Sequence, residues 1–305
     1  MLDEREVIVP VNPALVKLVD VVEAAEITDM NYIFRYHRLK LPTNNYSNYF
    51  ALFYKERQQD TWSVSRSLLS KDFTAAKTEV VINQIQENLG GVVHDQRHFR
   101  EQTSVKCSFT LTGYNIDIND DNDMDKVLFA LITNINTDAA LLKSAALTFN
   151  VINGFGGNLA LNLSFGVMKT LRVDGIGNED KSASMNNIFL LDSFTKRLIH
   201  DSRMDINISD VTNVQNQLAR QIETFKRFTV SQTMFEELMD LMPKKISKKF
   251  ECMFNALPEN FRNWYYCSYV LSAVVEAEKR IVLEVKLRSH VTKKIRSLLR
   301  AETQL

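Results

Sequence analysis

Residues 104–116 read SVKCSFTLTGYNI, and this stretch decides the fold. Every second residue from Val105 to Leu111 is apolar and the residues between them are polar, which is the period of a β-strand with one buried face. Residues 126–135 (KVLFALITNI), 145–152 (AALTFNVI) and 158–165 (NLALNLSF) have similar strand character, and connections rich in turn-forming residues separate these stretches. Successive strands joined by short turns predict an antiparallel meander with one solvated face.

The flanking sequence extends this sheet and adds helices. We assign residues 168–173 to a further strand, so that the predicted sheet occupies residues 47–173. Elsewhere apolar residues recur every three or four positions, which predicts amphipathic helices. These helices are expected at residues 13–27, 74–89, 210–228, 231–242, 263–280 and 285–300, with a short helix around 244–249. The predicted fold is α+β: a central antiparallel meander flanked by helices, with an α/β region over residues 1–205 and a helical region over 206–305.

The composition is that of an ordinary globular protein. The 305 residues include 37 Lys and Arg against 37 Asp and Glu, a balance that excludes a uniformly basic, polyanion-coating protein. The three cysteines, Cys107, Cys252 and Cys267, are an odd number, which argues against a disulfide framework and favours a reducing compartment. No apolar run reaches the ~18 residues that span a bilayer, and the acidic start MLDEREV is not that of a secretory signal. We therefore expect a cytoplasmic protein without a membrane partner.

Four motifs invite a chemical interpretation. The glycine-rich segment at 154–157 is followed by strand residues and not by a helix, so it predicts a turn rather than a nucleotide site. The acidic stretch at 117–125 lacks the glycine and the glutamate of a calcium loop, and we expect a solvated hairpin loop or at most a weak hard-cation site. His94 and His98 have the spacing of two zinc ligands on a helix, but their segment is expected to be loop or strand. Residues 200–202 (His-Asp-Ser) are neighbours in sequence, which does not make a catalytic triad. No catalytic residue, metal site or cofactor is predicted.

The zero net charge hides a basic C-terminal third. From Asp240 to Leu305 there are 13 basic and 7 acidic residues, a local excess of six positive charges. Aromatic residues lie between two basic clusters, and single strands are bound by cations that face phosphates and by flat rings that stack on bases. This pattern predicts nucleic-acid contacts at Lys244, Lys245, Lys248, Lys249, Tyr265, Tyr266, Lys286, Arg288, Lys293, Lys294, Arg296 and Arg300, with Tyr269 as a further stacking candidate. The alternative is that the aromatic residues belong to the core and the lysines form a solvated face.

Four segments of the chain resemble the phage- and plasmid-encoded family known as domain of unknown function 932. They are residues 61–70 (TWSVSRSLLS) with the helix predicted after them, 130–141 (ALITNINTDAAL), 146–157 (ALTFNVINGFGG) and 214–242. The resemblance covers about residues 50–280. The chain departs from the family where Thr137-Asp138-Ala139 replaces an Asp-Gly turn, and where Val151-Ile152 replaces a cysteine before Asn-Gly. The resemblance implies a phage or mobile-element origin and a role in DNA replication, recombination or conflict with the host, without an established activity.

These observations lead to three hypotheses about function. The leading one is a non-enzymatic protein of phage or mobile-element DNA metabolism that binds or anneals single-stranded DNA in recombination, as a homo-oligomer located in the host cytoplasm. The second is a protein-interaction or assembly module, either a phage structural component or an inhibitor of a host defence protein. In that case the acidic residues 1–30 of one subunit would attract the basic tail of the next. The third is a metal-dependent enzyme that uses the acids at 117–125 or the two histidines.

Overall fold

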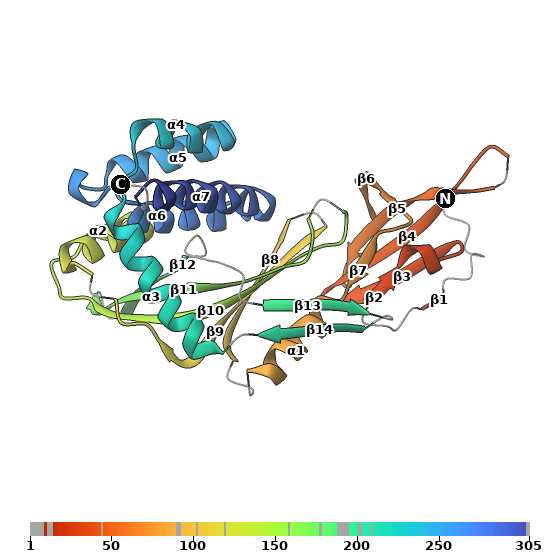
Figure 1. Cartoon of the computed structure of the whole chain (residues 1–305), viewed down its shortest axis with the longest axis horizontal. Helices are drawn as coiled ribbons and strands as arrows, with labels where there is room; N and C mark the ends of the chain where they lie inside the picture. The colour runs from red at the N-terminus through yellow and green to blue at the C-terminus, as the bar shows by residue number, and fades with distance from the viewer. Residues whose placement is uncertain are drawn as a thin grey trace.

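The structure, a computed structural model, describes most of the chain. The described residues are 9–10, 15–43, 45–89, 93–101, 103–118, 120–157, 159–176, 179–187, 195–200, 203–208 and 210–302. Within them, two five-stranded sheets share one apolar core, and most of the helices gather at one end of the long axis (Figure 1). The predicted α+β class, with antiparallel sheets and C-terminal helices, is confirmed. A single sheet was predicted over residues 47–173, but the strands of this range belong to both five-stranded sheets.

The first sheet has the strand order β1-β3-β4-β5-β6 in the described part of the chain. Its strands are β1 (Val9–Pro10), β3 (Ala24–Asp29), β4 (Tyr32–Lys40), β5 (Tyr46–Glu56) and β6 (Ser63–Ser70). Strands β3 to β6 are successive antiparallel neighbours, and β1 lies parallel to β3. Ile27, Phe34 and Leu52 are buried on the inner face, so the residues that alternate with them form an outer face.

The second sheet is an antiparallel meander, as predicted, with the order β12-β11-β10-β9-β8. Its strands are β8 (Val93–Glu101), β9 (Ser104–Asn115), β10 (Leu142–Gly154), β11 (Asn162–Ile176) and β12 (Glu179–Asn187). Phe109 and Phe149 are opposite each other on one face, and both are buried. Ser108 and Asn150 are opposite each other on the other face, and they are buried as well.

The expected solvated face is therefore absent around Ser108 and Asn150, whereas Leu142, Arg172 and Ser182, at the other end of the same face, are exposed as predicted. The hydroxyl of Ser108 donates to Oδ1 of Asn150 at 2.7 Å, and Nδ2 of Asn186 donates to the same oxygen at 2.8 Å. The hydroxyl of Thr148 donates to Oδ1 of Asn186 at 2.9 Å. A buried polar row is stable only when its members find hydrogen-bond partners within the protein. The alternating sequence pattern does not reveal whether those partners are water or side chains.

The helices of the described chain cluster mostly around the second sheet. They are α1 (Thr78–Asn88), α2 (Asn122–Thr133), α3 (Val211–Arg227), α4 (Gln232–Leu241), α5 (Lys244–Asn255), α6 (Trp264–Ala277) and α7 (Ile281–Glu302). The predicted helices at 74–89, 210–228, 231–242, 244–249, 263–280 and 285–300 are confirmed as α1 and α3 to α7. Two small antiparallel pairs complete the fold: β2 (Leu15–Lys17) with β7 (Thr74–Ala76), and β13 (Thr195–His200) with β14 (Arg203–Ile208). Figure 1 shows α4 to α7 packed together above the second sheet.

Two predicted elements are wrong. The helix predicted at 13–27 is replaced, over its described residues, by β2, a short 3-10 turn (Leu18–Asp20) and β3, because this segment pairs with β7 and β4. Tertiary pairing here overrides the helical spacing of its apolar residues. The strand predicted at 126–135 falls mostly in α2, because Asp121 caps that helix by accepting a hydrogen bond from the backbone N–H of Asp123 at 2.8 Å.

A buried junction joins the two sheets. Phe155, directly after β10, stacks on Phe34 of β4 with ring centroids 3.9 Å apart, and the hydroxyl of Tyr36 donates to the carbonyl oxygen of Phe155 at 3.3 Å. Asp29, at the end of β3, accepts a hydrogen bond from the backbone N–H of Glu79 at 3.1 Å and so caps α1. The core is therefore continuous from the first sheet to the helical layer.

Candidate nucleic-acid interface

The lysines of α5 lie on the exposed side of that helix. Lys244, Lys245, Lys248 and Lys249 are all exposed, whereas Ile246, Phe250 and Phe254 are buried on the opposite side. The apolar residues recur at a spacing of four, which places them on one stripe and leaves the lysines to the solvent. The structure thus presents the first predicted basic cluster at the surface.

The turn between α6 and α7 brings two further cations close to α5. Nζ of Lys245 binds Oε2 of Glu278 at 3.0 Å. The hydrogen bond from Lys245 lowers the pKa of Glu278, and the charges of Lys249 and Arg280 lower it further. Lys279 follows, exposed and with a φ of 52°. We define the α5–turn surface as Lys244, Lys245, Lys248, Lys249, Lys279 and Arg280, grouped around the carboxylate of Glu278.

The predicted cations of α7 fall into two groups. Lys286, Lys293, Arg296 and Arg300 are exposed. Lys294 is half-buried, and its Nζ binds Oε1 of Glu237 on α4 at 2.8 Å. Nε2 of His290 lies 3.0 Å from the other oxygen of Glu237. This ion pair holds α4 against α7, so Lys294 is less available to a phosphate than its exposed neighbours.

Arg288 is a correction to the predicted interface. Its side chain is buried, because it lies on the face of α7 that packs against the second sheet. Its guanidinium donates to Oγ of Ser164 at 2.7 Å and also to Oδ1 of Asn162, both on β11. Arg288 therefore anchors α7 to the sheet and is not placed to contact a nucleic acid.

The predicted stacking role of the α6 tyrosines is also wrong in this structure. Tyr265, Tyr266 and Tyr269 are 0%, 3% and 0% exposed. The centroid of the Tyr265 ring lies 5.0 Å from that of Tyr266 and 5.2 Å from that of Tyr269, and both pairs are edge-to-face. Burial raises the pKa of all three hydroxyls. Because α6 is buried around most of its surface, its aromatic residues belong to the core, as the alternative interpretation held.

The acidic stretch at 117–125 forms a buried charge cluster and not a solvated hairpin loop. Asp120 and Asp125 are buried, and Nζ of Lys169 on β11 binds a carboxylate oxygen of each. Lys143 lies 3.3 Å from Oδ2 of Asp125, and Lys226 lies 3.1 Å from Oδ1 of Asp120. The prediction failed because Asp121 starts a helix, which turns Asp125 inward. The hydroxyl of Tyr265 also donates to Asp120, at 2.8 Å.

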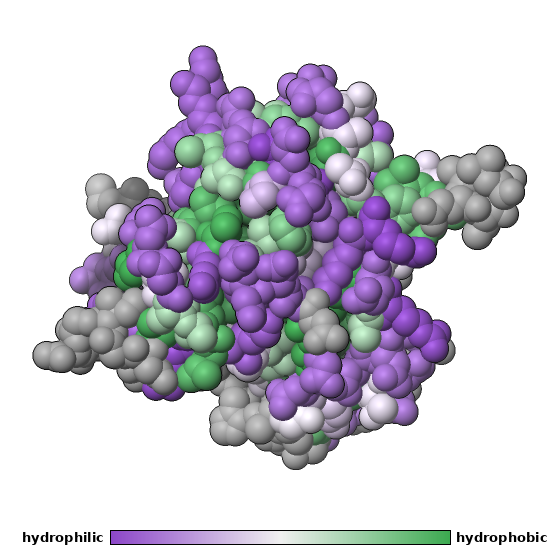
Figure 2. Space-filling view, turned by 90° about the vertical axis from the view of Figure 1, so that its left-hand side faces the viewer, coloured by the Kyte–Doolittle hydropathy of each residue, from purple (hydrophilic) through white to green (hydrophobic). Residues whose placement is uncertain are grey.

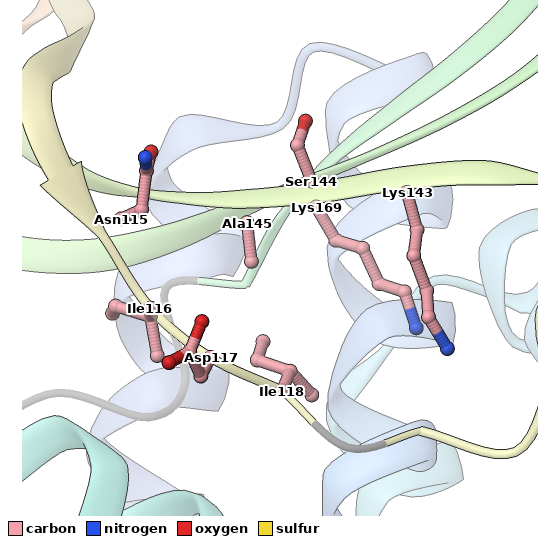
Figure 3. Close-up of a pocket in the computed structure, with 8 residues that line it drawn as sticks. All are labelled: Asn115, Ile116, Asp117, Ile118, Lys143, Ser144, Ala145 and Lys169. Atoms are coloured by element: carbon pink, nitrogen blue, oxygen red, sulfur yellow. The ribbon is translucent and has the colours of Figure 1, made fainter.

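A pocket of about 330 Å³ opens beside this cluster (Figure 3). It is lined by residues 115–118 on one side and by residues 143–145 with Lys169 on the other. Figure 3 shows the side chains of Lys143 and Lys169 extending in the same direction. Their ammonium groups are already bonded to Asp120 or Asp125, so the geometry favours a structural role for this charged wall.

A second buried cluster fixes α6 and α7 to the second sheet. Nζ of Lys106 on β9 binds Oε2 of Glu284 at 2.8 Å and Oε1 of Glu276 at 3.1 Å. Burial lowers the pKa of Lys106, but the two carboxylates outweigh it and the net shift is upward. Lys106 and Lys169 were missed as buried residues because each occupies a strand position at which a lysine is normally solvated. We find no local sequence signal that would have identified them.

The remaining sequence motifs were the histidine pair, residues 200–202 and the glycine-rich segment. His94 and His98 lie on β8, a strand, which does not give the helical spacing of two zinc ligands. Asp201 and Ser202 lie outside the described residues. The segment at 154–157 ends β10 in a turn, as predicted. Among the described residues, no group of three or more His, Cys, Asp or Glu side chains is placed to hold a metal ion.

The helical end of the molecule has a mainly polar surface. Figure 2 shows this side, on which hydrophilic residues predominate and hydrophobic residues form small, separate areas. No helix in the described part of the chain is long and apolar enough to cross a membrane. Comparisons with family models, with curated proteins and with solved structures each return no match.

Proposed function

We propose that this protein binds single-stranded DNA and that the α5–turn surface contacts its phosphates. The observation that carries the proposal is the grouping of exposed cations from two separate segments around a single carboxylate, Glu278. Cations on one surface neutralise neighbouring phosphates of a strand and release its counterions. Because the whole chain has zero net charge, this excess of positive charge is a property of the surface and not of the protein as a whole.

The exposed cations of α7 can extend this contact along a strand. Lys286, Lys293, Arg296 and Arg300 continue the positive charge over the helix that follows the turn. Contacts of this kind position a nucleic acid without reading its sequence. Such a surface suits a protein that coats or anneals strands during recombination, and we include this role and a homo-oligomeric state in the proposal.

Fluorescence anisotropy of a labelled single-stranded oligonucleotide at about 50 and about 200 mM salt tests the proposal. If all the cations of the α5–turn surface make phosphate contacts, affinity should fall by about 300-fold between the two conditions. Replacing Lys248 and Lys249 together by glutamate should weaken binding and reduce the dependence of log Kd on log salt by about 0.7 for each lost contact.

Two matched variants control for general effects on α5. Replacing Lys248 and Lys249 together by arginine keeps both charges and should retain affinity within about twofold. Glu251→Gln removes an exposed acid from the same helix and should strengthen binding slightly. Affinity that is independent of salt, or that is unchanged by the double glutamate variant, would contradict the proposal. Absence of binding at the lower salt would leave the protein-interaction hypothesis in its place.

A further inference from the structure

The outer face of the first sheet carries aromatic and apolar side chains that are exposed. Tyr49 on β5 is 53% exposed, and Val64 and Leu68 on β6 are 58% and 60% exposed. The strand register places Tyr49 and Leu68 on the same face. Leu68 pairs with Ala51, which lies two residues after Tyr49 on β5, and Tyr49 itself pairs with Ser70, two residues after Leu68 on β6. Large apolar side chains grouped on a surface usually mark a site of interaction.

Cations lie among these side chains. The guanidinium carbon of Arg35 lies 4.4 Å from the ring centroid of Trp62, and Nζ of Lys55 lies 5.1 Å from the same centroid. Arg66 is exposed on β6 between Val64 and Leu68. We define the β5–β6 patch as Tyr49, Lys55, Trp62, Val64, Arg66 and Leu68.

The charge of this outer face is positive in the described strands. In the described strands, the carboxylate on this face belongs to Glu26 of β3. Its Oε2 lies 2.8 Å from Nη2 of Arg35 and forms an ion pair with it. Lys55 contacts the ring of Trp62 and has no carboxylate opposite it in the strand register. A ligand for the patch therefore needs both flat apolar groups and negative charge.

We propose that the β5–β6 patch binds unpaired bases of a single strand, with the exposed ring of Tyr49 stacking on a base, Trp62 holding Lys55 beside it, and Lys55 and Arg66 facing phosphates. Unpaired bases stack on aromatic side chains, and cations beside the rings hold the backbone, on sheet faces of this kind. A duplex keeps its bases stacked internally and cannot use such a surface. This inference rests on the proposed function and adds to it the preference for single strands that the α5–turn surface does not provide.

The two surfaces lie at opposite ends of the molecule, the first sheet at the right and α5 at the left of Figure 1. Their contributions can therefore be separated by mutation. Tyr49→Ala should weaken binding of a single-stranded oligonucleotide about tenfold, whereas Tyr49→Phe, which keeps the ring, should stay within about twofold. Arg66→Ala should reduce the slope of log Kd against log salt by about 0.7, the amount expected for one phosphate contact. Leu142→Ala, at a site on β10 that is also exposed, should have no effect.

The same variants are titrated with a duplex of matched length, and thermal melting confirms that each one is folded. Duplex affinity should be unchanged by Tyr49→Ala and lowered by the double glutamate variant of α5. If Tyr49→Ala and Arg66→Ala both leave single-strand affinity within about twofold while the α5 variant weakens it, this inference is overturned and the proposed function stands. If the wild-type protein binds no oligonucleotide, both are overturned.

A membrane surface could also accept aromatic residues and cations, so vesicles of anionic phospholipid form a second arm of the test. Vesicle binding that is lost in Tyr49→Ala and Leu68→Ala, with single-strand affinity unchanged, would overturn the inference in favour of a lipid ligand. Single-strand binding that depends on Tyr49, with no vesicle binding, would support it.

Discussion

Both five-stranded sheets consist mainly of antiparallel strands, but the second sheet is covered by helices over much of the face that is exposed in the first. In the second sheet, helices cover the part of the polar face that carries Lys106 and Asn150, and both residues bond to other side chains. In the first sheet, the corresponding face is open, and Tyr49 and Leu68 are more than half exposed. Buried polar residues of the second sheet therefore bond within the fold, whereas exposed side chains of the first sheet face the solvent.

The largest effect should come from the charge cluster of the second sheet. Lys169→Met would leave Asp120 and Asp125 buried without their shared cation, and we expect a loss of about 3–5 kcal/mol in the free energy of unfolding. Lys55→Met, on the open face of the first sheet, should cost about 1 kcal/mol or less, because its contact with Trp62 is a surface cation–π interaction. Urea denaturation measures both. Equal losses of unfolding free energy in the two variants would contradict the stated difference between the two sheets.

The junction between the sheets should give the protein a pH-dependent stability. Burial raises the pKa of Asp29 from 3.8 to about 6. Between these values the folded protein binds more protons than the unfolded chain, so stability falls as the pH rises from about 4 to about 6. The full contribution is on the order of 3 kcal/mol.

Asp29→Asn removes this titration while keeping an oxygen that can cap α1. Urea denaturation of both proteins at pH 4, 5, 6 and 7 should show wild-type stability declining relative to the variant as the pH increases. A difference between the two proteins that stays constant over this range would contradict the assignment.

A smaller effect is expected at Gly166, which lies beside the buried polar side chains of Thr148, Asn150 and Asn186. A Cβ at Gly166 would lie 2.7 Å from Oγ1 of Thr148, 2.9 Å from Oδ1 of Asn186 and 3.1 Å from Nδ2 of Asn150. Gly166→Ala should therefore destabilise the protein by about 1–3 kcal/mol. Gly113→Ala, where a Cβ meets nothing within 4 Å but φ is +82°, should cost about 1 kcal/mol through backbone strain alone. A thermal shift for Gly166→Ala no larger than that of Gly113→Ala would argue against a tightly packed polar row.

The smallest stability effect should come from the patch proposed to bind single strands. Arg66→Ala and Leu68→Ala change exposed side chains and should alter the free energy of unfolding by less than about 0.5 kcal/mol. Their oligonucleotide affinities, in contrast, should fall. A variant that loses both stability and affinity would show that the open face also supports the fold.

Much of the architecture follows from sequence periodicity. The alternation from Val105 to Leu111 predicted a strand of the meander, and the three- and four-residue spacing of Val214, Leu218 and Ile222 predicted α3. The helix predicted at 13–27 was wrong because its described residues pair with β7, far along the chain, and with β4. Local propensity contains no information about such partners.

The candidate site was predicted only in part, for a related reason. The cations of α5 lie at exposed helical positions, and helical spacing predicts that exposure. The burial of Tyr265 and Arg288 depends on how α6 and α7 pack on the sheet. The β5–β6 patch was not predicted, because its residues are separated in the sequence and only the pairing of β5 with β6 brings them together on an exposed face.

Ultraviolet cross-linking of a single-stranded oligonucleotide containing 5-bromodeoxyuridine, followed by peptide mass spectrometry, tests most directly where a strand lies. Our account predicts cross-links in peptides of β5 and β6 that contain Tyr49 or Trp62, and their loss in the Tyr49→Ala and Trp62→Ala variants. Cross-links confined to the α6 peptide that contains Tyr265, Tyr266 and Tyr269, with β5 and β6 unmodified, would contradict it.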